Sequence, residues 1–221
     1  MNIDALPESI RRKLEAMNLD ELPEVPKLTP EEEAAAVRAD LRERRAAIAR
    51  ERWAETCPPL HVVARLFDFR NPQQEAAART AWEWLGSDAL TFVLAGPVGV
   101  GKSRLACALG REAAEDGVRP VFISATSYLK GWRPEGDARA SRSAHRSPFL
   151  VLDDIGVAKG SEWAADTLTD LMEHRINHGL RTVTTTNVTA AQLRDLYGER
   201  LVDRLAYRAR YATIVGSSRR S

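Results

Sequence analysis

A glycine-rich loop of eight residues constrains the fold of this chain more than any other segment. It reads Gly96-Pro97-Val98-Gly99-Val100-Gly101-Lys102-Ser103 and follows the apolar run Thr91–Ala95. The spacing fits G-x-x-x-x-G-K-[ST], in which backbone N–H groups between a strand and a helix converge on phosphate groups. Glycine lets the main chain curl this tightly, and a helix starting near Lys102 adds the positive end of its dipole. We therefore predict a nucleoside triphosphate site, with Lys102 at the β- and γ-phosphates and Ser103 on Mg²⁺.

The candidate nucleotide contacts comprise the whole loop and the residue after it. They are Gly96, Pro97, Val98, Gly99, Val100, Gly101, Lys102, Ser103 and Arg104. The alternative interpretation is a glycine-rich turn with a chance lysine. It is disfavoured because all four fixed positions of the pattern are met in the required context.

A second apolar run, Phe149–Leu152, ends in two carboxylates, Asp153 and Asp154. A buried parallel strand would bring Asp153 to the edge of the sheet, beside the metal already contacted by Ser103. Asp154 would then orient an attacking water. An ordinary strand entering a turn is the alternative, and the phosphate loop upstream favours the metal site.

Strand-like and helix-like segments alternate from about residue 60 onward. We predict strands over 91–95, 119–124, 149–152, 181–186 and 211–215, and helices over 71–85, 102–116 and 161–178. This alternation indicates an α/β fold in which a five-stranded parallel sheet lies between helices. Ligands of such sheets bind at the carboxyl ends of the strands, where the loop and the two aspartates are expected to meet.

The first 58 residues contain no strand pattern and are predicted to form a helical N-terminal arm, followed by the nucleotide-binding domain over 59–221. We expect a short helix over 7–19, an extended segment over 22–28, and a long helix from the cap Thr29 to Trp53. A narrow apolar stripe of Val37, Leu41 and Ile48 runs along the long helix. The arm either docks a protein partner or forms a solvated, self-packed helix.

Composition narrows the class further. Hydrophobic residues make up 44% and charged residues 29%, as in a globular protein, and the net charge of +1 confines any nucleic-acid contact to local patches. No run approaches the ~18 apolar residues of a membrane span. Cys57 and Cys107 are too few for a disulfide framework, so a cytoplasmic location is expected. His174 and His178 lack a third metal ligand nearby and are expected to be structural.

Three further residues are candidate catalytic groups. Asn187 ends the predicted fourth strand beside the expected carboxylates, and Arg200 and Arg204 share one face of a helix. An arginine at the edge of one subunit suits stabilisation of phosphoryl charge in a neighbouring subunit. Each feature alone also fits an ordinary strand end or a solvated basic face.

Together, these segments resemble the DnaC/IstB-like group of AAA+ ATPases, which contains helicase loaders and transposition helper ATPases. The resemblance rests on the loop 96–103, Leu152–Gly156, Thr185–Asn187, Gly198–Leu205 and Val215–Arg220, and covers about residues 60–220. It implies Lys102 and Ser103 as Walker A, Asp153 and Asp154 as Walker B, and Asn187 as sensor 1. It also implies Arg204 as an arginine finger acting in trans within a homo-oligomer, with Arg200 as its companion.

Two points of detail qualify the resemblance. Seventeen residues follow Arg204, too few for the helical lid of most AAA+ proteins, and the loader group similarly lacks that lid. Asp154 stands where many AAA+ enzymes have Glu, and its shorter side chain puts the rate of hydrolysis in question.

Members of the group resemble one another in binding single-stranded DNA along the axis of a ring or spiral. The matching segment lies between the second and third predicted strands, and its candidate DNA contacts are Lys130, Trp132, Arg133, Arg139, Arg142 and Arg146. Tyr128 and Trp132 are placed to stack on bases, with steep salt dependence of binding expected. The alternative is a solvated loop whose aromatic residues pack inward.

The resulting prediction is an ATP- and Mg²⁺-dependent ATPase that loads a replicative helicase, docked through the arm, onto single-stranded DNA. One alternative is a transposase-assisting ATPase on duplex DNA. Others are a nucleotide-gated adaptor with little hydrolysis and a small-molecule kinase. The kinase is disfavoured because no lid-like insertion rich in phosphate-clamping arginines is evident.

Overall fold

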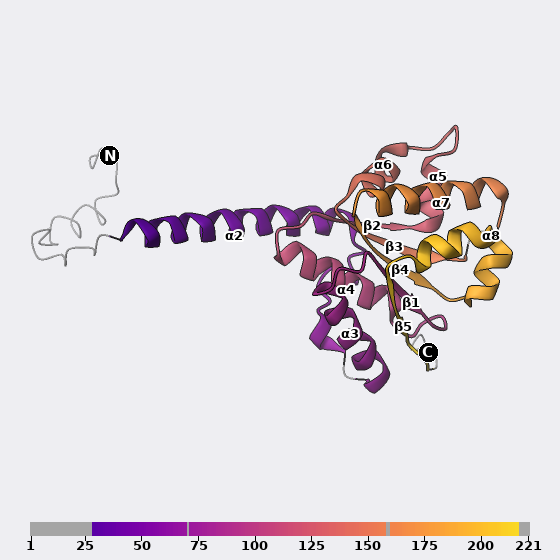
Figure 1. Ribbon diagram of the computed structural model, residues 1–221, viewed down its shortest axis with the longest axis horizontal. Coiled ribbons are helices and arrows are strands. Elements are labelled where there is room, and N and C mark those ends of the chain that lie inside the picture. The colour runs from indigo at the N-terminus through magenta and orange to yellow at the C-terminus, as the bar shows by residue number, and fades with distance from the viewer. Residues whose placement is uncertain (1–27, 70, 158–159, 217–221) are drawn as a thin grey trace, which may run out of the picture. The chain divides into compact units, whose positions relative to one another are not determined.

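The computed structural model describes residues 28–69, 71–157 and 160–216 (Figure 1). The chain divides into two compact units, residues 1–39 and 40–221. The larger unit therefore begins inside the long helix, whereas the sequence placed a boundary at residue 58. The predicted helix over 7–19 and the extended segment up to residue 27 lie outside the described residues.

Helix α2 (Pro30–Thr56) begins where the sequence predicts. The N–H of Thr29 donates to Glu32 Oε2 (2.7 Å), and the N–H of Glu32 donates to Thr29 Oγ1 (3.3 Å), which forms a capping box. These reciprocal bonds satisfy two donors that the first turn leaves without helical partners. The predicted start is confirmed, and the helix continues three residues past the predicted end.

The apolar stripe predicted on α2 does not form the buried face of the helix. Val37, Leu41 and Ile48 are all about half exposed. The buried residues of α2 are instead Ala46, Ala49 and Trp53. The latter two belong to the apolar core of the larger unit. The small alanine side chains allow close approach, so one large ring supplies most of the buried area.

The sheet has five strands in the order β2-β3-β4-β1-β5, and every pair is parallel. The strands are β1 (Thr91–Ala95), β2 (Pro120–Ser124), β3 (Phe149–Ile155), β4 (Arg181–Thr186) and β5 (Ala209–Thr213). The predicted α/β fold with a parallel five-stranded sheet is confirmed. Strand β3 runs three residues further than predicted because pairing with β4 resumes at Ile155, after an irregularity beyond Leu152. Strand β5 begins two residues earlier than predicted.

Helices cover both faces of the sheet (Figure 1). One face packs against the end of α2, α3 (Pro72–Leu85) and α4 (Lys102–Glu115), and the other packs against α5 (Ala125–Gly131), α7 (Glu162–Asn177) and α8 (Ala190–Ala206). Side chains alternate between the two cores along β3, with Val151 on the first face and Leu150 and Leu152 on the second.

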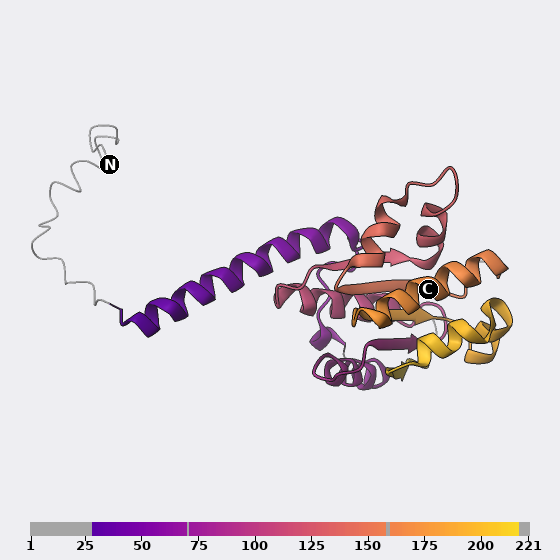
Figure 2. The ribbon, with the colours of Figure 1, turned by 45° about the horizontal axis from the view of Figure 1, so that its top comes forward.

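Three elements were not predicted from the sequence. They are the short 3₁₀ helix η3 (Leu66–Asp68), the helix α6 (Ala138–Arg146), and α5. Helices α5 and α6 lie next to the edge strand β2, as Figure 2 shows. The first half of α8 was also missed, and its kink lies at Gly198, whose φ is 81°. No helix in the described ranges is both long enough and apolar enough to span a bilayer.

Candidate functional site

The loop between β1 and α4 has the backbone that its glycines predict. Gly96, Gly99 and Gly101 have φ angles of 147°, 83° and 100°, which side-chain-bearing residues rarely adopt. At Gly96, a Cβ atom would lie 2.2 Å from the carbonyl oxygen of Ile214, so only glycine fits. Gly101 is the N-cap of α4, which directs the first amides of that helix into the loop.

Lys102 is 5% exposed, and its ammonium group lies inside the loop. Its Nζ donates to the carbonyl oxygens of Gly96 (2.9 Å) and Pro97 (2.8 Å). A buried cation requires such acceptors, and phosphate oxygens are stronger ones because they carry charge. The cation therefore lies beside the amides that the loop presents.

Gln74 supports the loop from α3, and sequence reasoning missed it. Its Nε2 donates to the carbonyl oxygen of Val100 (2.6 Å), and the side chain is buried. Leu60 and His61, also missed, line the same cleft from the segment before η3. The loop motif carries no signal for these residues, which precede it by more than twenty positions.

Asp153 and Asp154 lie in the last three residues of β3, in two different environments. Asp153 is 7% exposed, and its Oδ1 accepts a hydrogen bond of 2.7 Å from Thr185 Oγ1 on β4. Burial raises the pKa of Asp153, while hydrogen bonds from Thr185 and Ser103 and the charge of Lys102 oppose the rise. A bound cation would stabilise the charged carboxylate at this position, because it compensates the negative charge that burial disfavours.

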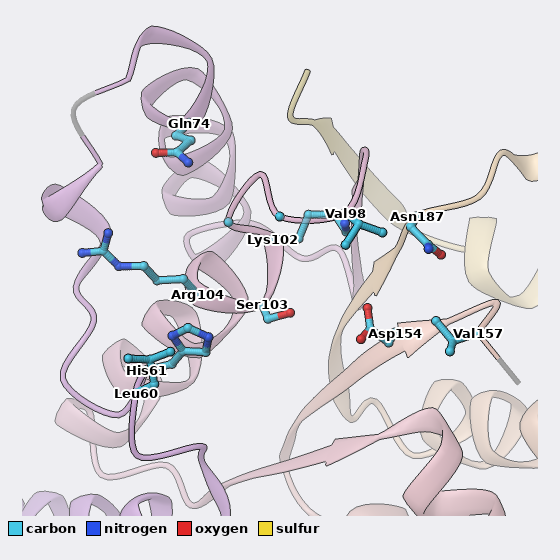
Figure 3. A pocket seen from close by; sticks show the side chains of 12 residues that line it. Leu60, His61, Gln74, Val98, Lys102, Ser103, Arg104, Asp154, Val157 and Asn187 are labelled. Carbon is cyan, nitrogen blue, oxygen red and sulfur yellow. The ribbon is translucent and has the colours of Figure 1, made fainter. Parts of the chain in front are cut away.

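Asp154 has a φ of 59°, a left-handed conformation that is uncommon for a residue with a side chain. The N–H of Asp154 donates to Thr185 Oγ1 (2.9 Å), so one hydroxyl ties both aspartates to β4. This turn brings the Asp154 side chain into the cleft, on the side opposite Ser103 (Figure 3). Backbone strain of this kind is common at functional sites.

The cleft has a volume of about 560 Å³ and is lined by residues of the loop, of the β3 end and of the β4 end. Asn187 lines it beside Asp154 (Figure 3). Its Oδ1 is buried and has no hydrogen-bond partner within the described part of the chain. A buried polar atom without a partner is costly unless a ligand or water satisfies it.

The chemistry of these groups fits a triphosphate with a divalent cation. The cleft combines a glycine cradle, a buried ammonium and a helix N-terminus, which suit phosphate. Ser103 and the carboxylates offer the oxygen ligands that Mg²⁺ prefers. The predicted contacts divide by role: Gly99, Gly101 and Val98 line the cleft, whereas Gly96, Pro97 and Val100 contribute carbonyl oxygens that hold the loop.

Arg104 also lines the cleft, but its guanidinium points away from the loop (Figure 3). The guanidinium carbon lies 5.1 Å from the centre of the Phe69 ring, and NH2 lies 3.9 Å from Asp68 Oδ2. Its contacts in the structure are thus with the η3 segment.

Arg200 and Arg204 lie in α8 beyond the kink and do not line this cleft. Both contact one carboxylate, Glu173 of α7: Oε1 accepts from Arg204 Nε (3.0 Å) and Arg200 NH2 (3.2 Å). These bonds lower the pKa of Glu173. The two arginines are therefore held together, as their spacing predicts, at a site outside the chain's own cleft.

The six predicted DNA contacts separate into two groups. Lys130, Trp132 and Arg133 lie at the end of α5, where the Arg133 guanidinium lies 5.7 Å from the centre of the Trp163 ring. Tyr128, predicted to stack on bases, is 1% exposed and packs edge-on against Trp132, so that prediction was wrong. The other three residues, Arg139, Arg142 and Arg146, lie on α6.

His174 and His178 belong to a stack of three imidazole rings. The ring centres of His145 and His174 are 4.0 Å apart, and those of His174 and His178 are 4.1 Å apart. Burial and the neighbouring cations lower the pKa values of His145 and His174. The lowered pKa values of His145 and His174 reduce charge repulsion within the stack.

Comparison with known proteins identifies the family of the chain. Residues 32–221 match the family described as IstB-like ATP binding protein. A Sinorhizobium fredii protein named as an insertion sequence ATP-binding protein is 31% identical over 139 residues, covering 58% of this chain and 56% of that protein. A Pseudomonas fluorescens protein named as an ATP-binding protein of insertion sequence IS1162 is 33% identical over 88 residues, or 38% of each chain.

The chain thus spans about half or less of the length of these relatives. Among solved structures, the DnaC helicase loader superposes with a TM-score of 0.62 at 22% identity. The superposition covers 71% of this chain and 99% of that one. At this identity the likeness establishes a shared AAA+ fold.

Proposed function

Because the chain belongs to the IstB-like family of ATP-binding proteins within the DnaC/IstB-like AAA+ ATPases, we propose that it is a magnesium-dependent ATPase that acts on DNA as an accessory to a transposase. The observation that carries the nucleotide part is the convergence of Lys102, Ser103, Asp154 and Asn187 on one cleft. The alternative functions considered above also require this site to bind ATP, and the nucleotide-gated adaptor uses it for binding with little hydrolysis.

The residues of the cleft have distinct roles in this proposal. The loop amides and Lys102 bind the β- and γ-phosphates, and Lys102 exchanges two carbonyl acceptors for phosphate oxygens. Ser103 and Asp153 hold Mg²⁺, which neutralises phosphate charge when bound. Asp154 orients the attacking water and accepts its proton, and Asn187 hydrogen-bonds the same water or the γ-phosphate.

Arg204, with Arg200, completes the site of a neighbouring copy. The support is positional, since both guanidinium groups lie on one exposed edge with Glu173 and outside the cleft of their own chain. A cation that reaches another subunit's phosphates makes turnover depend on assembly. ATP then favours the oligomer, and hydrolysis weakens it.

The partner protein distinguishes the two DNA functions: a transposase for transposition and a replicative helicase for helicase loading. The relatives named for insertion sequences favour a transposase, whereas the likeness to the helicase loader concerns the fold alone. Docking of a replicative helicase through the arm, with loading onto single-stranded DNA, is the alternative that the test must exclude. An ATP-gated adaptor with little turnover is the remaining one.

The test measures ATP binding and turnover in the full chain. Lys102→Ala should abolish Mg²⁺-dependent ATP binding, while Lys130→Ala, which removes an exposed lysine outside the cleft, should leave it intact. Asp154→Asn should retain binding and lose turnover, and unchanged turnover would remove the role given to Asp154. Stimulation by duplex rather than single-stranded DNA favours the transposase accessory, and the reverse preference favours the loader. Binding that survives Lys102→Ala would refute the whole proposal.

A further inference from the structure

A second hollow lies at the edge of the sheet opposite the nucleotide cleft. It has a volume of about 530 Å³ and is bounded by the end of α2, the start of β2 and one face of α6. We call it the arginine groove after five of the residues that line it. These are Arg52, Arg119, Arg139, Arg142 and Arg146.

The arginine groove is strongly positive. All five arginines are exposed, and Glu55 is the one carboxylate among the described residues that line it. Glu55 pairs with Arg52 at 3.2 Å. None of the other four arginines has an ion pair to a carboxylate within residues 28–69, 71–157 and 160–216. Most of the other arginines in these ranges of the larger unit do have one. Unpaired guanidinium groups gathered in a concave surface form an anion site of high local potential.

Both walls of the groove are held by hydrogen bonds and by a buried side chain. On the α2 side, Trp53 is 2% exposed, and Thr56 Oγ1 accepts a hydrogen bond of 3.2 Å from the N–H of Phe122 on β2. On the α6 side, Arg175 is fully buried and donates to the carbonyl oxygens of Ala144 (2.8 Å) and Ser147 (2.9 Å). The groove is therefore preorganised, which lowers the entropic cost of binding.

The floor of the groove is fixed as well. Ser147 Oγ donates toward the carbonyl oxygens of Arg119 (3.1 Å) and Phe149 (2.6 Å), which joins the start of β2 to the start of β3. The backbone that carries Arg119 is thus hydrogen-bonded to Ser147, the residue that follows α6.

The spacing of the cations on α6 matches a phosphate backbone. Arg139, Arg142 and Arg146 stand three and four residues apart, so they share one helical face. The seven steps from Arg139 to Arg146, each a rise of about 1.5 Å, give a row about 10 Å long. One strand of B-form DNA presents a phosphate about every 3.4 Å along its axis, so this row faces about three phosphates.

We infer that the arginine groove binds the phosphate backbone of DNA, and that it prefers duplex to single strands. None of the described residues that line the groove is aromatic, so it offers no platform on which unpaired bases could stack. The inference deepens the proposed function and rests on it in one respect, the action on DNA. It adds Arg52 and Arg119 to the DNA surface and removes Lys130, Trp132 and Arg133, which lie outside the groove.

The experiment measures the binding of the full chain, with Mg²⁺ and ATP, to fluorescent 20-mers of mixed sequence by anisotropy between 50 and 200 mM salt. Five phosphate contacts predict a loss of about 500-fold in duplex affinity over this range, and four contacts about 150-fold. Arg119→Gln and Arg142→Gln should each produce the shallower dependence. Arg194→Gln, which removes an exposed arginine of α8 that is paired with Glu199, is the charge-matched control and should leave the dependence unchanged.

Each of the other outcomes contradicts one part of the proposal: the location of the DNA site, the preference for duplex, or the action on DNA. If Lys130→Gln and Arg133→Gln flatten the salt dependence while the groove variants do not, the groove is excluded and the action on DNA stands. Tighter binding of the single-stranded 20-mer, lost in the same groove variants, overturns the duplex preference. If the wild-type chain binds neither 20-mer yet hydrolyses ATP, the groove serves an acidic protein surface instead, and the DNA part of the proposed function falls with the inference. Unchanged melting temperatures verify that the variants fold.

Discussion

Replacement of Thr185 by valine tests whether one hydroxyl holds both aspartates of the nucleotide site in place. The Thr185 hydroxyl donates to Asp153 Oδ1 at 2.7 Å and accepts from the N–H of Asp154 at 2.9 Å. Valine has the same shape and removes both bonds. A hydrogen bond to a charged group is worth about 1.5–3 kcal/mol and a neutral one about 0.5–1.5 kcal/mol. We expect the free energy of unfolding to fall by about 3 kcal/mol, which is about 6–12 °C in melting temperature for a protein of this size.

The neighbouring Thr184 supplies the control. Thr184 is 1% exposed, and its Oγ1 has no hydrogen-bond partner among the described residues. Thr184→Val therefore removes a buried hydroxyl that gains nothing from its surroundings, and the variant should melt at the wild-type temperature or slightly above it. Thermal unfolding followed by circular dichroism compares two identical chemical changes at adjacent positions of β4. Equal shifts for both variants would refute the assignment of Thr185 as the residue that ties down the aspartates.

The effect of Thr185→Val should also depend on pH in a fixed direction. Burial raises the pKa of Asp153 in the folded state, so its contribution to stability is full at low pH and is lost as the pH rises through that pKa. The hydrogen bond from Thr185 lowers the pKa of Asp153 and so reduces this loss of stability, whereas valine removes the hydrogen bond and makes the loss larger. The difference between wild type and variant should therefore grow as the pH rises above the ordinary range of an aspartate, about 4. A difference that shrinks with rising pH would contradict the sign.

Three further predictions concern other parts of the larger unit. Arg175 makes four hydrogen bonds while fully buried, so Arg175→Met should lower the free energy of unfolding by about 3–5 kcal/mol in urea titrations, and a loss below 1 kcal/mol would contradict its structural role. Gly110→Ala should destabilise by about 1–2 kcal/mol in the same assay despite its better helix propensity, because the new Cβ would lie 2.4 Å from the Trp53 ring; a gain in stability would show that α2 does not pack there. Arg204→Ala and Lys102→Ala should each be inactive alone and regain turnover when mixed, since each supplies the half-site that the other lacks. No recovery in any mixture would argue against action in trans.

The sequence predicted features whose physical cause is local. The loop backbone follows from three glycines and a lysine within eight positions, and the start of α2 follows from Thr29 and Glu32, three residues apart. The order of strands and helices follows from periodicity, so the fold class was predictable.

Features assembled from distant segments were not predictable. Gln74 holds the loop from 26 positions upstream of Val100, the residue whose carbonyl it binds. The side of α2 that becomes buried depends on the space that Gly110 leaves for Trp53, so the more hydrophobic stripe of α2 remained exposed. Helix α6 has few apolar residues and is held by bonds from Arg175 and Ser141, contacts that no period in the sequence reveals.

The parallel sheet separates the two anion sites by the length of its strands. Strand β3 begins beside the arginine groove at Phe149 and ends at Ile155, just past Asp153, a run of seven residues and about 20 Å. Over that distance two unit charges in water interact by about 0.2 kcal/mol before salt screening, whose length is about 8 Å at physiological ionic strength. Nucleotide and DNA phosphates would therefore not repel each other measurably in one chain. Any dependence of DNA affinity on ATP must then come from assembly or from movement of packed elements, of which α4 is the most direct because it starts at Lys102 and contacts Trp53 at Gly110.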